Sequence, residues 1–394
     1  MQRLVTMRIA EVSTYVVKLS GPQAYLGKLE DGSELSEDRG YVVREPWRSL
    51  YSGRFETMLV RVTAEDGTTG WGEALAPVAP EVPAAIVDRM LAGWLTGHEI
   101  TGVRPLWLGL RDLMRERGHL VGHQADALAA VDIALWDLYG KLTGLPVADL
   151  LGGAVRTHVP AYVSGLPRPT DAERAALAAE WAGKGATLVK LALGKGIEAD
   201  LATFDAVAQA APSMRIAVDA HWAYRIGEAA ELGQELDRRK ALFFEAPLVP
   251  EDVDGHAELA ARIRTPVAVG EAMRNRYEFA DWLGRRALRL AQPDVARTGI
   301  TEAMSIAELA SAHHVPVACH HSVGLGIALA AGIHVSAASA DTPFFEYQPD
   351  TIPVAQSILR SPLTAGPAGF AVPTGPGLGI DVDAEKITEL AKEN

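Results

Sequence analysis

Apolar and polar residues alternate along two stretches near the N-terminus, residues 7–18 and 56–73. Such alternation is typical of strands that bury one face. The pair Asp66-Gly67, within the second stretch, supplies the residues that a tight hairpin turn favours. The pattern therefore predicts a small antiparallel sheet at the start of the chain.

The region between these stretches, residues 19–52, is rich in glycine, serine and charged residues. We interpret it as a long surface loop, and long ordered loops are often functional. It is our candidate for a lid over a substrate.

Residues 124–142 (QADALAAVDIALWDLYGKL) repeat apolar residues at helical spacing and end at Gly144-Leu145-Pro146, which stops a helix. The pattern predicts a buried helix.

From Val159 onward, short apolar strands alternate with alanine-rich helical stretches, which indicates repeated βα units. The eight strand candidates are PAYVSG, TLVKLAL, RIAVDAHW, ALFFEAP, PVAVGEA, RLAQPDVA, VPVACHH and FFEYQ. Eight units of about 25 residues fit a closed parallel barrel better than an open sheet. No convincing long helix follows the eighth strand, and we interpret the Gly/Pro-rich tail around residues 375–379 as structural turns rather than a phosphate-binding loop.

Length and composition narrow the class of protein. A chain of 394 residues suits an α/β barrel with a second domain, and 48% hydrophobic with 22% charged residues is typical of a globular enzyme. The net charge of −13 without a basic run argues against nucleic acid or an anionic membrane as a partner. The single cysteine, Cys319, excludes an internal disulfide, and no apolar run approaches the roughly 18 residues that span a bilayer. We therefore predict a cytoplasmic protein, with Cys319 as a small core residue rather than a nucleophile.

Seven strand candidates carry, near their C-terminal ends, a polar residue that strand packing does not require: Lys190, Asp219, Glu245, Glu271, Asp294, His321 and Glu346. These ends share one mouth in a parallel barrel. Asp219, Glu245 and Glu271 are spaced 26 residues apart, so they come from adjacent strands. Converging carboxylates repel each other unless a cation binds them, and oxygen ligands without His or Cys favour Mg²⁺, or Mn²⁺, over Zn²⁺. Each acid could instead be an N-cap of the next helix, an alternative that three acids in register make weaker.

Asp294 and His321 end the next two strand candidates, so the carboxylate can orient the imidazole as a base. His320 and His321 cannot both face the mouth if the strand alternates. We expect His320, His313 and His314 to be core or surface residues.

Several motifs together resemble the mandelate racemase branch of the enolase superfamily: GWGEA, ALAAVDIALWDLYGKLTGLPVADLLGG, the VDA, FFEAP and VGEA series, QPD, and PTGPGLGIDVD. The resemblance covers almost the whole chain. It implies an α/β fold, a modified (β/α)7β TIM barrel with an α+β capping domain formed by the N-terminal region and the C-terminal tail. We expect the capping domain at residues 1–125, the barrel at 126–350, and a returning C-terminal segment at 351–394.

The resemblance also implies roles for individual residues. Asp219, Glu245 and Glu271 would bind Mg²⁺, His321 paired with Asp294 would be the base, and Glu346 would hydrogen-bond the carboxylate of the substrate. Two positions distinguish subgroups of the branch. Lys190-Leu191-Ala192 lacks the second lysine of the Lys-x-Lys found in its racemases. The His of Asp219-Ala220-His221 resembles the general acid of galactonate and mannonate dehydratases; it could also be a second-layer partner of the metal.

Together with these residues, the resemblance implies a hydro-lyase that dehydrates an acid sugar, such as an aldonate, to a 2-keto-3-deoxy acid. Mg²⁺ and Lys190 would hold the carboxylate, His321 would take the α-proton, and His221 would help to expel the 3-hydroxyl as water. Tyr25, Arg44, Trp47 and Arg48 are candidate substrate-binding residues in the early loop, or ordinary surface residues. The resemblance further suggests a homo-oligomer, a dimer or an octamer, acting on a small carboxylate.

Other functions remain open at this stage. A racemase, epimerase or cycloisomerase of the same superfamily is the main alternative, although the missing lysine argues against racemisation. A non-catalytic metal-binding scaffold would need none of His321, Asp294 and His221. A Zn²⁺ hydrolase would need histidines among its metal ligands.

Overall fold

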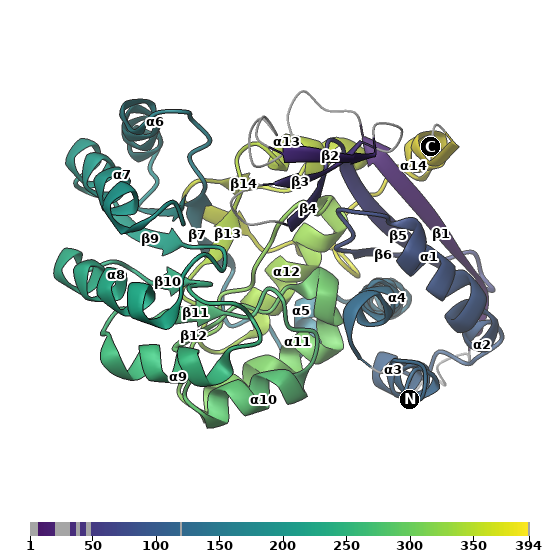
Figure 1. Cartoon of the computed structure of the whole chain (residues 1–394). Helices are drawn as coiled ribbons and strands as arrows, with labels where there is room; N and C mark the ends of the chain where they lie inside the picture. The colour runs from purple at the N-terminus through teal and green to yellow at the C-terminus, as the bar shows by residue number, and fades with distance from the viewer. Residues whose placement is uncertain (1–6, 20–31, 37–39, 45–48, 119, 393–394) are drawn as a thin grey trace.

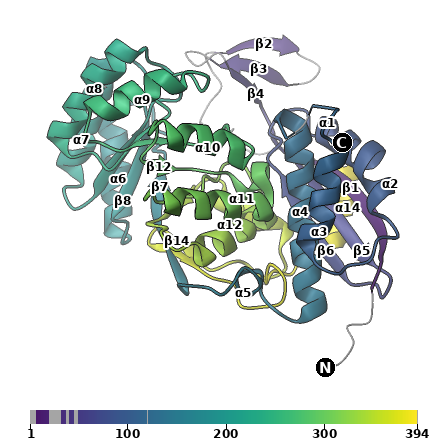
Figure 2. The ribbon, with the colours of Figure 1, turned by 90° about the horizontal axis from the view of Figure 1, so that it is seen from below.

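The computed structural model describes residues 7–19, 32–36, 40–44, 49–118 and 120–392. A sheet covered by helices, from the N-terminal part of the chain, lies beside a larger array in which strands are surrounded by helices (Figures 1 and 2). The C-terminal helix lies next to the N-terminal sheet, at the opposite end of the molecule from α6 to α9.

The first sheet has the order β1-β5-β6 and is antiparallel, with β1 at Ile9–Leu19, β5 at Phe55–Ala64 and β6 at Thr69–Ala74. The predicted hairpin is confirmed, since β5 and β6 are joined by a turn in which Gly67 has φ 86°. A positive φ of this kind is adopted readily only by glycine.

The prediction of a surface loop at residues 19–52 is wrong for the residues of this region that the structure describes. Three strands form a separate antiparallel sheet in the order β2-β3-β4, with β2 at Gly32–Ser36, β3 at Tyr41–Arg44 and β4 at Ser49–Ser52. Figure 2 shows this sheet standing away from the rest of the N-terminal part, beyond α1. The glycine, serine and charged residues of this region are depleted in strands, so composition favoured a loop.

Helices cover the first sheet. They are α1 (Glu81–Ile86), a π-helical turn (Val87–Leu91), α2 (Ala92–Leu95), α3 (Val103–Leu113), α4 (Gly122–Thr143) and α5 (Val147–Leu150). The predicted buried helix is confirmed as α4, which ends at Gly144 with φ 74°. Gly72 of the GWGEA motif allows α4 to lie directly on β6, because a Cβ atom there would meet the Ala130 carbonyl oxygen at 1.8 Å.

The second part has the parallel strand path β12-β11-β10-β9-β8-β7, with β13 pairing β7 on its other edge. The strands are β7 (His158–Ser164), β8 (Leu188–Ala192), β9 (Arg215–Asp219), β10 (Phe244–Glu245), β11 (Val267–Val269), β12 (Leu290–Ala291) and β13 (Phe345–Tyr347). The predicted strand VPVACHH makes only isolated parallel bridges, from Val317 to Ala291 and from His320 to Asp294. It therefore takes its expected place beside β12 without forming a regular strand.

A helix follows each of these strand positions up to the seventh. They are α6 (Asp171–Gly183), α7 (Ile197–Ala210), α8 (Ile226–Arg239), α9 (Val253–Arg262), α10 (Arg276–Gly284), α11 (Val295–Ala312) and α12 (Gly326–Ala338). Local sequence explains several starts: Thr170 with Glu173, and Asn275 with Glu278, form capping boxes at α6 and α10. This arrangement confirms the modified α/β barrel architecture.

The C-terminal segment has short elements before it returns to the first sheet. They are α13 (Ile352–Ala355), a 3-10 turn (Gln356–Ile358), β14 (Ala365–Gly366), β15 (Gly369–Ala371) and α14 (Ala384–Lys392). No long helix follows β13 in the described chain, as the sequence predicted. The Gly/Pro-rich tail is structural: Gly377 accepts a hydrogen bond from the Val147 backbone N–H and donates one to the Leu145 carbonyl.

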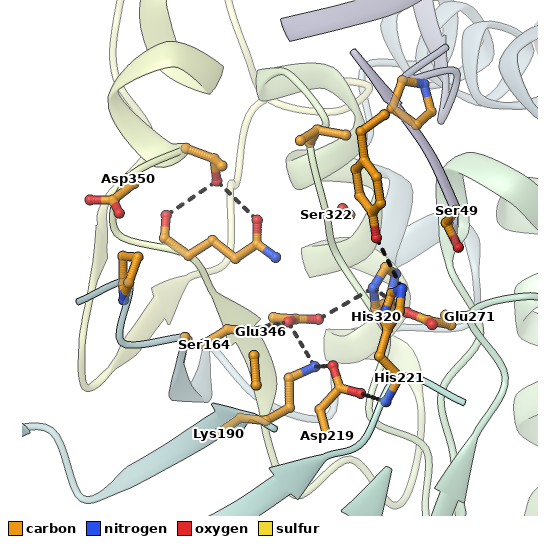
Figure 3. A pocket seen from close by; sticks show the side chains of 18 of the residues that line it. Ser49, Ser164, Lys190, Asp219, His221, Glu271, His320, Ser322, Glu346 and Asp350 are labelled. Carbon is orange, nitrogen blue, oxygen red and sulfur yellow. Dashed lines mark hydrogen bonds and ion pairs between the residues drawn. The ribbon is translucent and has the colours of Figure 1, made fainter. Parts of the chain in front are cut away.

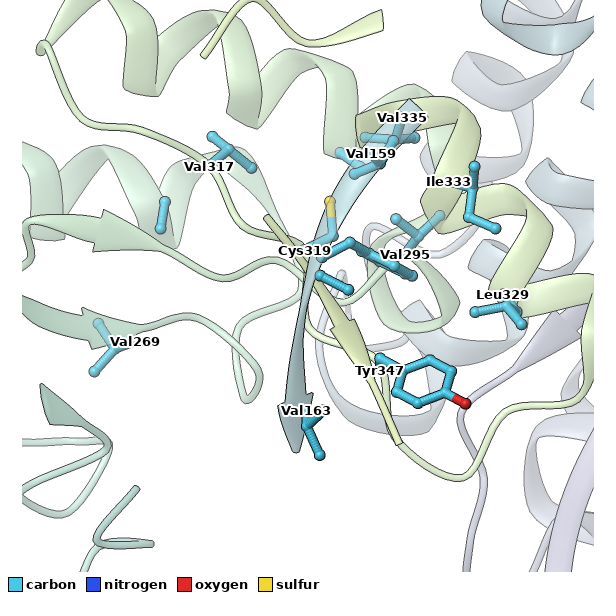
Figure 4. Packing of buried hydrophobic residues seen from close by; sticks show 14 of the residues in the cluster. Val159, Val163, Val269, Val295, Val317, Cys319, Leu329, Ile333, Val335 and Tyr347 are labelled. Atoms are coloured by element: carbon cyan, nitrogen blue, oxygen red, sulfur yellow. The ribbon is translucent and has the colours of Figure 1, made fainter. Parts of the chain in front are cut away.

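One apolar cluster fills the space between the strands and the helices around them. Cys319 is fully buried in this cluster together with Val159, Val295 and Val335 (Figure 4), which confirms its prediction as a core residue.

Buried acids on α4 connect the two parts. Asp132 accepts hydrogen bonds from the backbone N–H and the hydroxyl of Thr301 in α11, at 2.8 and 2.6 Å. Asp137 accepts from the backbone N–H groups of Trp71 and Leu378. The boundary predicted between residues 125 and 126 thus falls inside a helix that packs on both parts, and the division into domains stays a prediction.

Glu73 makes a second connection between the parts. Its carboxylate accepts hydrogen bonds from the Leu325 and Ala328 backbone N–H groups at 2.6 and 2.8 Å, at the start of α12, whose own N-cap side chain provides none. A carboxylate at this position satisfies otherwise unpaired donors and complements the helix dipole.

Within the described residues, no helix is long and apolar enough to cross a membrane.

Candidate active site

A cavity of about 1040 Å³ opens at the C-terminal ends of the parallel strands. Its floor includes Lys190, Asp219, Glu271 and Glu346. Residues of β4 and the segment after β6 line the opposite wall, so both parts of the chain contribute to it. Figure 3 shows Lys190, Asp219, His221, Glu271, His320 and Glu346 gathered around this space.

The three predicted metal ligands occupy neighbouring strand ends. Asp219 and Glu245 are the last residues of β9 and β10 and pair in register, and Glu271 follows β11 by two residues. Among the described residues, however, no three His, Cys, Asp or Glu side chains already converge on a point where a metal ion would fit. Their oxygens contact Lys190, Gln292 and His320 instead.

Lys190 lies among carboxylates at the cavity floor. Its Nζ is 2.7 Å from Glu245 Oε1, 3.1 Å from Glu346 Oε1 and 3.8 Å from Asp219 Oδ2. Burial lowers the pKa of Lys190, but Glu245 and Glu346 outweigh this effect and hold the pKa well above its ordinary value. The ammonium group of Lys190 thus lies between Asp219, Glu245 and Glu346 and offsets part of their negative charge.

The ammonium of Lys190 does not offset the effect of burial on two of the neighbouring acids. Burial raises the pKa of Glu245 to about 8 and also raises the pKa of Asp219, despite the nearby lysine. Asp219 and Glu245 beside Lys190, with Glu271 at the next strand end, are the oxygen donors that a divalent cation fits, because a cation removes the repulsion between carboxylates.

The predicted pairing of His321 with Asp294 is wrong, since it is His320 that contacts this carboxylate. His320 Nδ1 lies 2.6 Å from Asp294 Oδ2, and its Nε2 lies 2.9 Å from Glu271 Oε2. His321 points into the core, where its ring lies 5.9 Å from that of Phe345 and its Nε2 has no hydrogen-bond partner. Burial lowers the pKa of His321 to about 4, which keeps it neutral. As alternation predicts, only one of the two histidines faces the cavity, but it is His320 and not His321.

Glu346, at the centre of β13, lies between Lys190 and His320. Its Oε1 accepts a hydrogen bond from Ser164 at 2.6 Å, and its Oε2 accepts one from the His321 backbone N–H at 3.1 Å. His320 Nε2 is 3.9 Å from the same Oε2 atom. Lys190 and His320 therefore approach one carboxylate from opposite sides.

His221 also faces the cavity, although it lies beyond the end of β9. β9 ends at Asp219, and His221 has a left-handed backbone with φ 46°, in a turn where its N–H donates to Asp219 Oδ1 at 2.9 Å. Its Nε2 lies 3.0 Å from the Tyr51 hydroxyl of β4. A positive φ at a histidine is uncommon and costs energy, so the surrounding contacts hold it in place.

Sequence reasoning missed several residues of the site. Gln292 donates to Glu245 Oε2 at 2.6 Å, and Tyr51 contacts His221. Alternation could have found Gln292, which precedes Asp294 by two residues, whereas no local signal points to Tyr51. Of the loop candidates, Tyr25, Trp47 and Arg48 lie outside the described residues, and only the backbone of Arg44, at the end of β3, is described.

The comparisons with known proteins agree with this geometry. Residues 50–152 match the model of the mandelate racemase/muconate lactonizing enzyme N-terminal domain, and residues 173–387 match that of the enolase C-terminal domain-like family. The chain belongs to the mandelate racemase branch of the enolase superfamily. It is 35% identical over 356 residues to a D-galactarolactone cycloisomerase of Agrobacterium fabrum, covering 87% of this chain and 93% of that protein. It is 32% identical to a D-galactonate dehydratase of Ralstonia pickettii, covering 85% and 91%.

Solved structures of this superfamily superpose closely. An enolase superfamily member from Agrobacterium tumefaciens gives a TM-score of 0.93 at 34% identity, covering 98% of this chain and 99% of that one. A mandelate racemase/muconate lactonizing protein from Paracoccus denitrificans, complexed with magnesium, gives 0.80 at 29% identity, covering 98% of both chains. Members of the superfamily use Mg²⁺, in agreement with the donor chemistry of the three strand-end acids.

Proposed function

We propose that this protein removes the α-proton of a sugar acid and eliminates the β-oxygen, dehydrating the acid to a 2-keto-3-deoxy product. The observation that carries the proposal is the placement of three proton-carrying groups, Lys190, His320 and His221, around one cavity floored by strand-end carboxylates. The α-proton of a carboxylate is only weakly acidic. Its removal therefore needs both a positioned base and positive charge beside the carboxylate.

Asp219, Glu245 and Glu271 would hold a divalent cation, with Mg²⁺ preferred by their oxygen chemistry. When bound, that cation supplies positive charge that stabilises the substrate carboxylate as the α-carbon loses its proton. Lys190 would contribute a second positive charge close by, since its Nζ lies within 3.8 Å of Asp219, Glu245 and Glu346.

His320 would act as the base. Asp294 holds Nδ1 of the imidazole, which fixes the orientation of the ring, and Nε2 lies on the cavity side, 2.9 Å from Glu271 Oε2. The α C–H bond breaks toward Nε2, and its electron pair forms the double bond between the α- and β-carbons.

His221 would protonate the departing hydroxyl, so that it leaves as water while the β C–O bond breaks. The resulting enol takes a proton at the former β-carbon and releases its hydroxyl proton, which gives the 2-keto-3-deoxy acid. Ala192 lines the cavity where a second lysine would stand in a Lys-x-Lys pair, so that face of the substrate lacks a second basic group and racemisation is disfavoured.

Cycloisomerisation of a sugar lactone is the second candidate, favoured by the D-galactarolactone cycloisomerase among the relatives. In a five-membered lactone of a six-carbon diacid, the ring oxygen sits on the carbon β to the free carboxylate. The same proton removal would therefore open the ring. The leaving oxygen departs as a carboxylate, which needs no proton, so His221 would be dispensable for this reaction.

The two reactions are separated by one panel of substrates. Protein with Mg²⁺ is incubated with aldonates, aldarates and aldarolactones, and keto acids are trapped with semicarbazide. We expect keto acid from at least one open-chain acid, and the His221→Asn variant run in D₂O should exchange the α-proton of that acid while losing most dehydration.

Keto acid from lactones alone, equally fast in the His221→Asn variant, would favour cycloisomerisation over dehydration. Epimerisation without any keto acid would contradict both eliminations. The homo-oligomer stays a prediction, which these assays do not test.

A further inference from the structure

The wall of the cavity beyond the carboxylate floor is basic, although the whole chain carries a net charge of −13. The basic residues that line the cavity away from Lys190 are Arg54, Arg168, Arg174, Lys195, Arg274 and Arg297. Only Glu56 and Asp350 oppose them outside the floor. A basic wall facing a cavity this size attracts anionic groups.

Two of these residues, Arg274 and Arg297, occupy equivalent positions in neighbouring βα units. Arg274 follows Glu271 by three residues, and Arg297 follows Asp294 by three. Since Glu271 and Asp294 both contact His320, we place both guanidinium groups on the side of the cavity that holds the proposed base.

The two guanidinium groups share a single partner. Arg274 Nε donates to Asp126 Oδ1 at 3.1 Å, while the closest nitrogen of Arg297 is 3.9 Å from the same oxygen. Asp126 is the only carboxylate within 4.0 Å of either group in the part of the chain that the structure describes. At ion-pair distance the two guanidinium groups thus share one carboxylate, while Asp294 acts on Arg274 only at longer range.

Donors also remain unused. Nε of Arg297 is buried without a hydrogen-bond partner, and the side chains of Arg274 and Arg297 are only 15% and 22% exposed. Arg297 stands in the first turn of α11, where the helix dipole disfavours a cation, and the acid at this helix end, the N-cap Asp294, is already engaged by the Ala296 N–H and by His320. An anion between the two groups would accept hydrogen bonds from the guanidinium groups that line the cavity and would offset their charge.

We propose that Arg274 and Arg297 bind a second carboxylate at the far end of the substrate, which makes the substrate a sugar diacid or its lactone rather than a simple aldonate. This inference rests on the proposed function, in which the first carboxylate lies at the floor beside Lys190. The cavity of about 1040 Å³ is large enough to hold a six-carbon chain between the two sites.

The test compares Arg297→Gln with Lys195→Gln, a control that removes a cation from another wall of the same cavity. Binding of galactarate and galactonate, and of glucarate and gluconate, is measured by calorimetry on Mg²⁺-loaded protein in a His320→Asn background, which prevents turnover. Arg297 is chosen because its contact with Asp126 is longer than that of Arg274, so its removal disturbs the fold less. Urea unfolding of each variant checks that the fold is kept.

We expect the parent protein to bind one diacid at least about 10-fold more tightly than the matching monoacid. Arg297→Gln should weaken the diacid about 10- to 100-fold and change the monoacid less than about 3-fold, since one charged hydrogen-bonding partner is lost. Lys195→Gln should preserve the preference. Equal losses for diacid and monoacid, no loss, or a loss of preference only in Lys195→Gln would overturn the assignment.

The outcome is independent of the reaction itself. If the parent enzyme forms no keto acid from any compound, the proposed elimination fails, while a preference for diacids that depends on Arg297 would still support the second carboxylate site.

Discussion

Nδ1 of His320 lies 2.6 Å from Oδ2 of Asp294, and the other oxygen of Asp294 accepts the Ala296 backbone N–H at 2.8 Å. One carboxylate thus begins α11 and orients an imidazole at the same time. The helix fixes the carboxylate, so the direction of the histidine ring is set before any substrate binds.

The two adjacent histidines should behave differently on mutation. His320→Asn is expected to lower kcat by about 10²- to 10⁴-fold, because the proposed base is removed. His321→Asn should keep kcat within about 10-fold and lower the free energy of unfolding by about 1–3 kcal/mol, because its ring packs in the core. Steady-state kinetics and urea unfolding of both variants check this, and a larger loss of activity for His321→Asn than for His320→Asn would contradict it.

Asp294→Asn separates orientation from helix capping. The amide oxygen can still accept the Ala296 N–H, while the amide group facing His320 no longer accepts from Nδ1. We expect stability within about 1 kcal/mol of the parent and kcat lowered about 10²- to 10⁴-fold. A variant that unfolds easily but turns over normally once folded would show that Asp294 serves the helix alone.

Glu73 gives a pH dependence of stability. Burial raises its pKa to about 7, although the Leu325 and Ala328 N–H groups and the Thr57 hydroxyl favour its charged form. A carboxyl whose pKa is higher in the folded than in the unfolded chain contributes its stability fully below pH 4.5. It loses that contribution as the pH rises through about 7.

Glu73→Gln cannot titrate at this position. The free energy of unfolding of the parent, relative to this variant, should therefore fall by on the order of 3 kcal/mol between pH 4 and pH 8. Urea unfolding of both proteins across this range measures the difference. A constant difference would mean that the three hydrogen bonds outweigh burial and that Glu73 ionises normally.

Cation binding should displace Lys190 from Glu245. The 2.7 Å contact between them uses an oxygen that a divalent cation would need. We expect protein treated with EDTA to lose activity and to regain it with Mg²⁺, and calorimetry to detect Mg²⁺ binding that Glu245→Gln weakens at least about 10-fold. The control variant Glu235→Gln, on the surface of α8, should bind Mg²⁺ as the parent does. Full activity in EDTA would rule out the metal site.

Tyr51→Phe tests whether the β4 contact positions His221. We expect dehydration to slow about 3- to 30-fold while KM changes little, because the imidazole keeps its place near Asp219 but loses the hydroxyl that orients it. Exchange of the α-proton in D₂O should continue at the parent rate. Equal slowing of both steps would assign Tyr51 a structural role instead.

The sequence by itself determined the architecture and the inventory of the site. Spacing of apolar residues located β1, β5, β6, α4 and the βα units, since side-chain periodicity is a local property of the chain. Regular spacing of Asp219, Glu245 and Glu271 placed them at neighbouring strand ends, because each βα unit returns the chain to the same mouth.

Only the tertiary structure decided which histidine faces the cavity. His320 and His321 differ by one position, and a shift of one residue reverses the faces of a strand. The segment holding them makes isolated bridges instead of a regular ladder, so no local pattern fixes its register. The approach of Tyr51 to His221, and of Arg274 and Arg297 to Asp126, joins residues more than 140 positions apart. Such contacts depend on how the two parts of the chain pack, which no window of sequence contains.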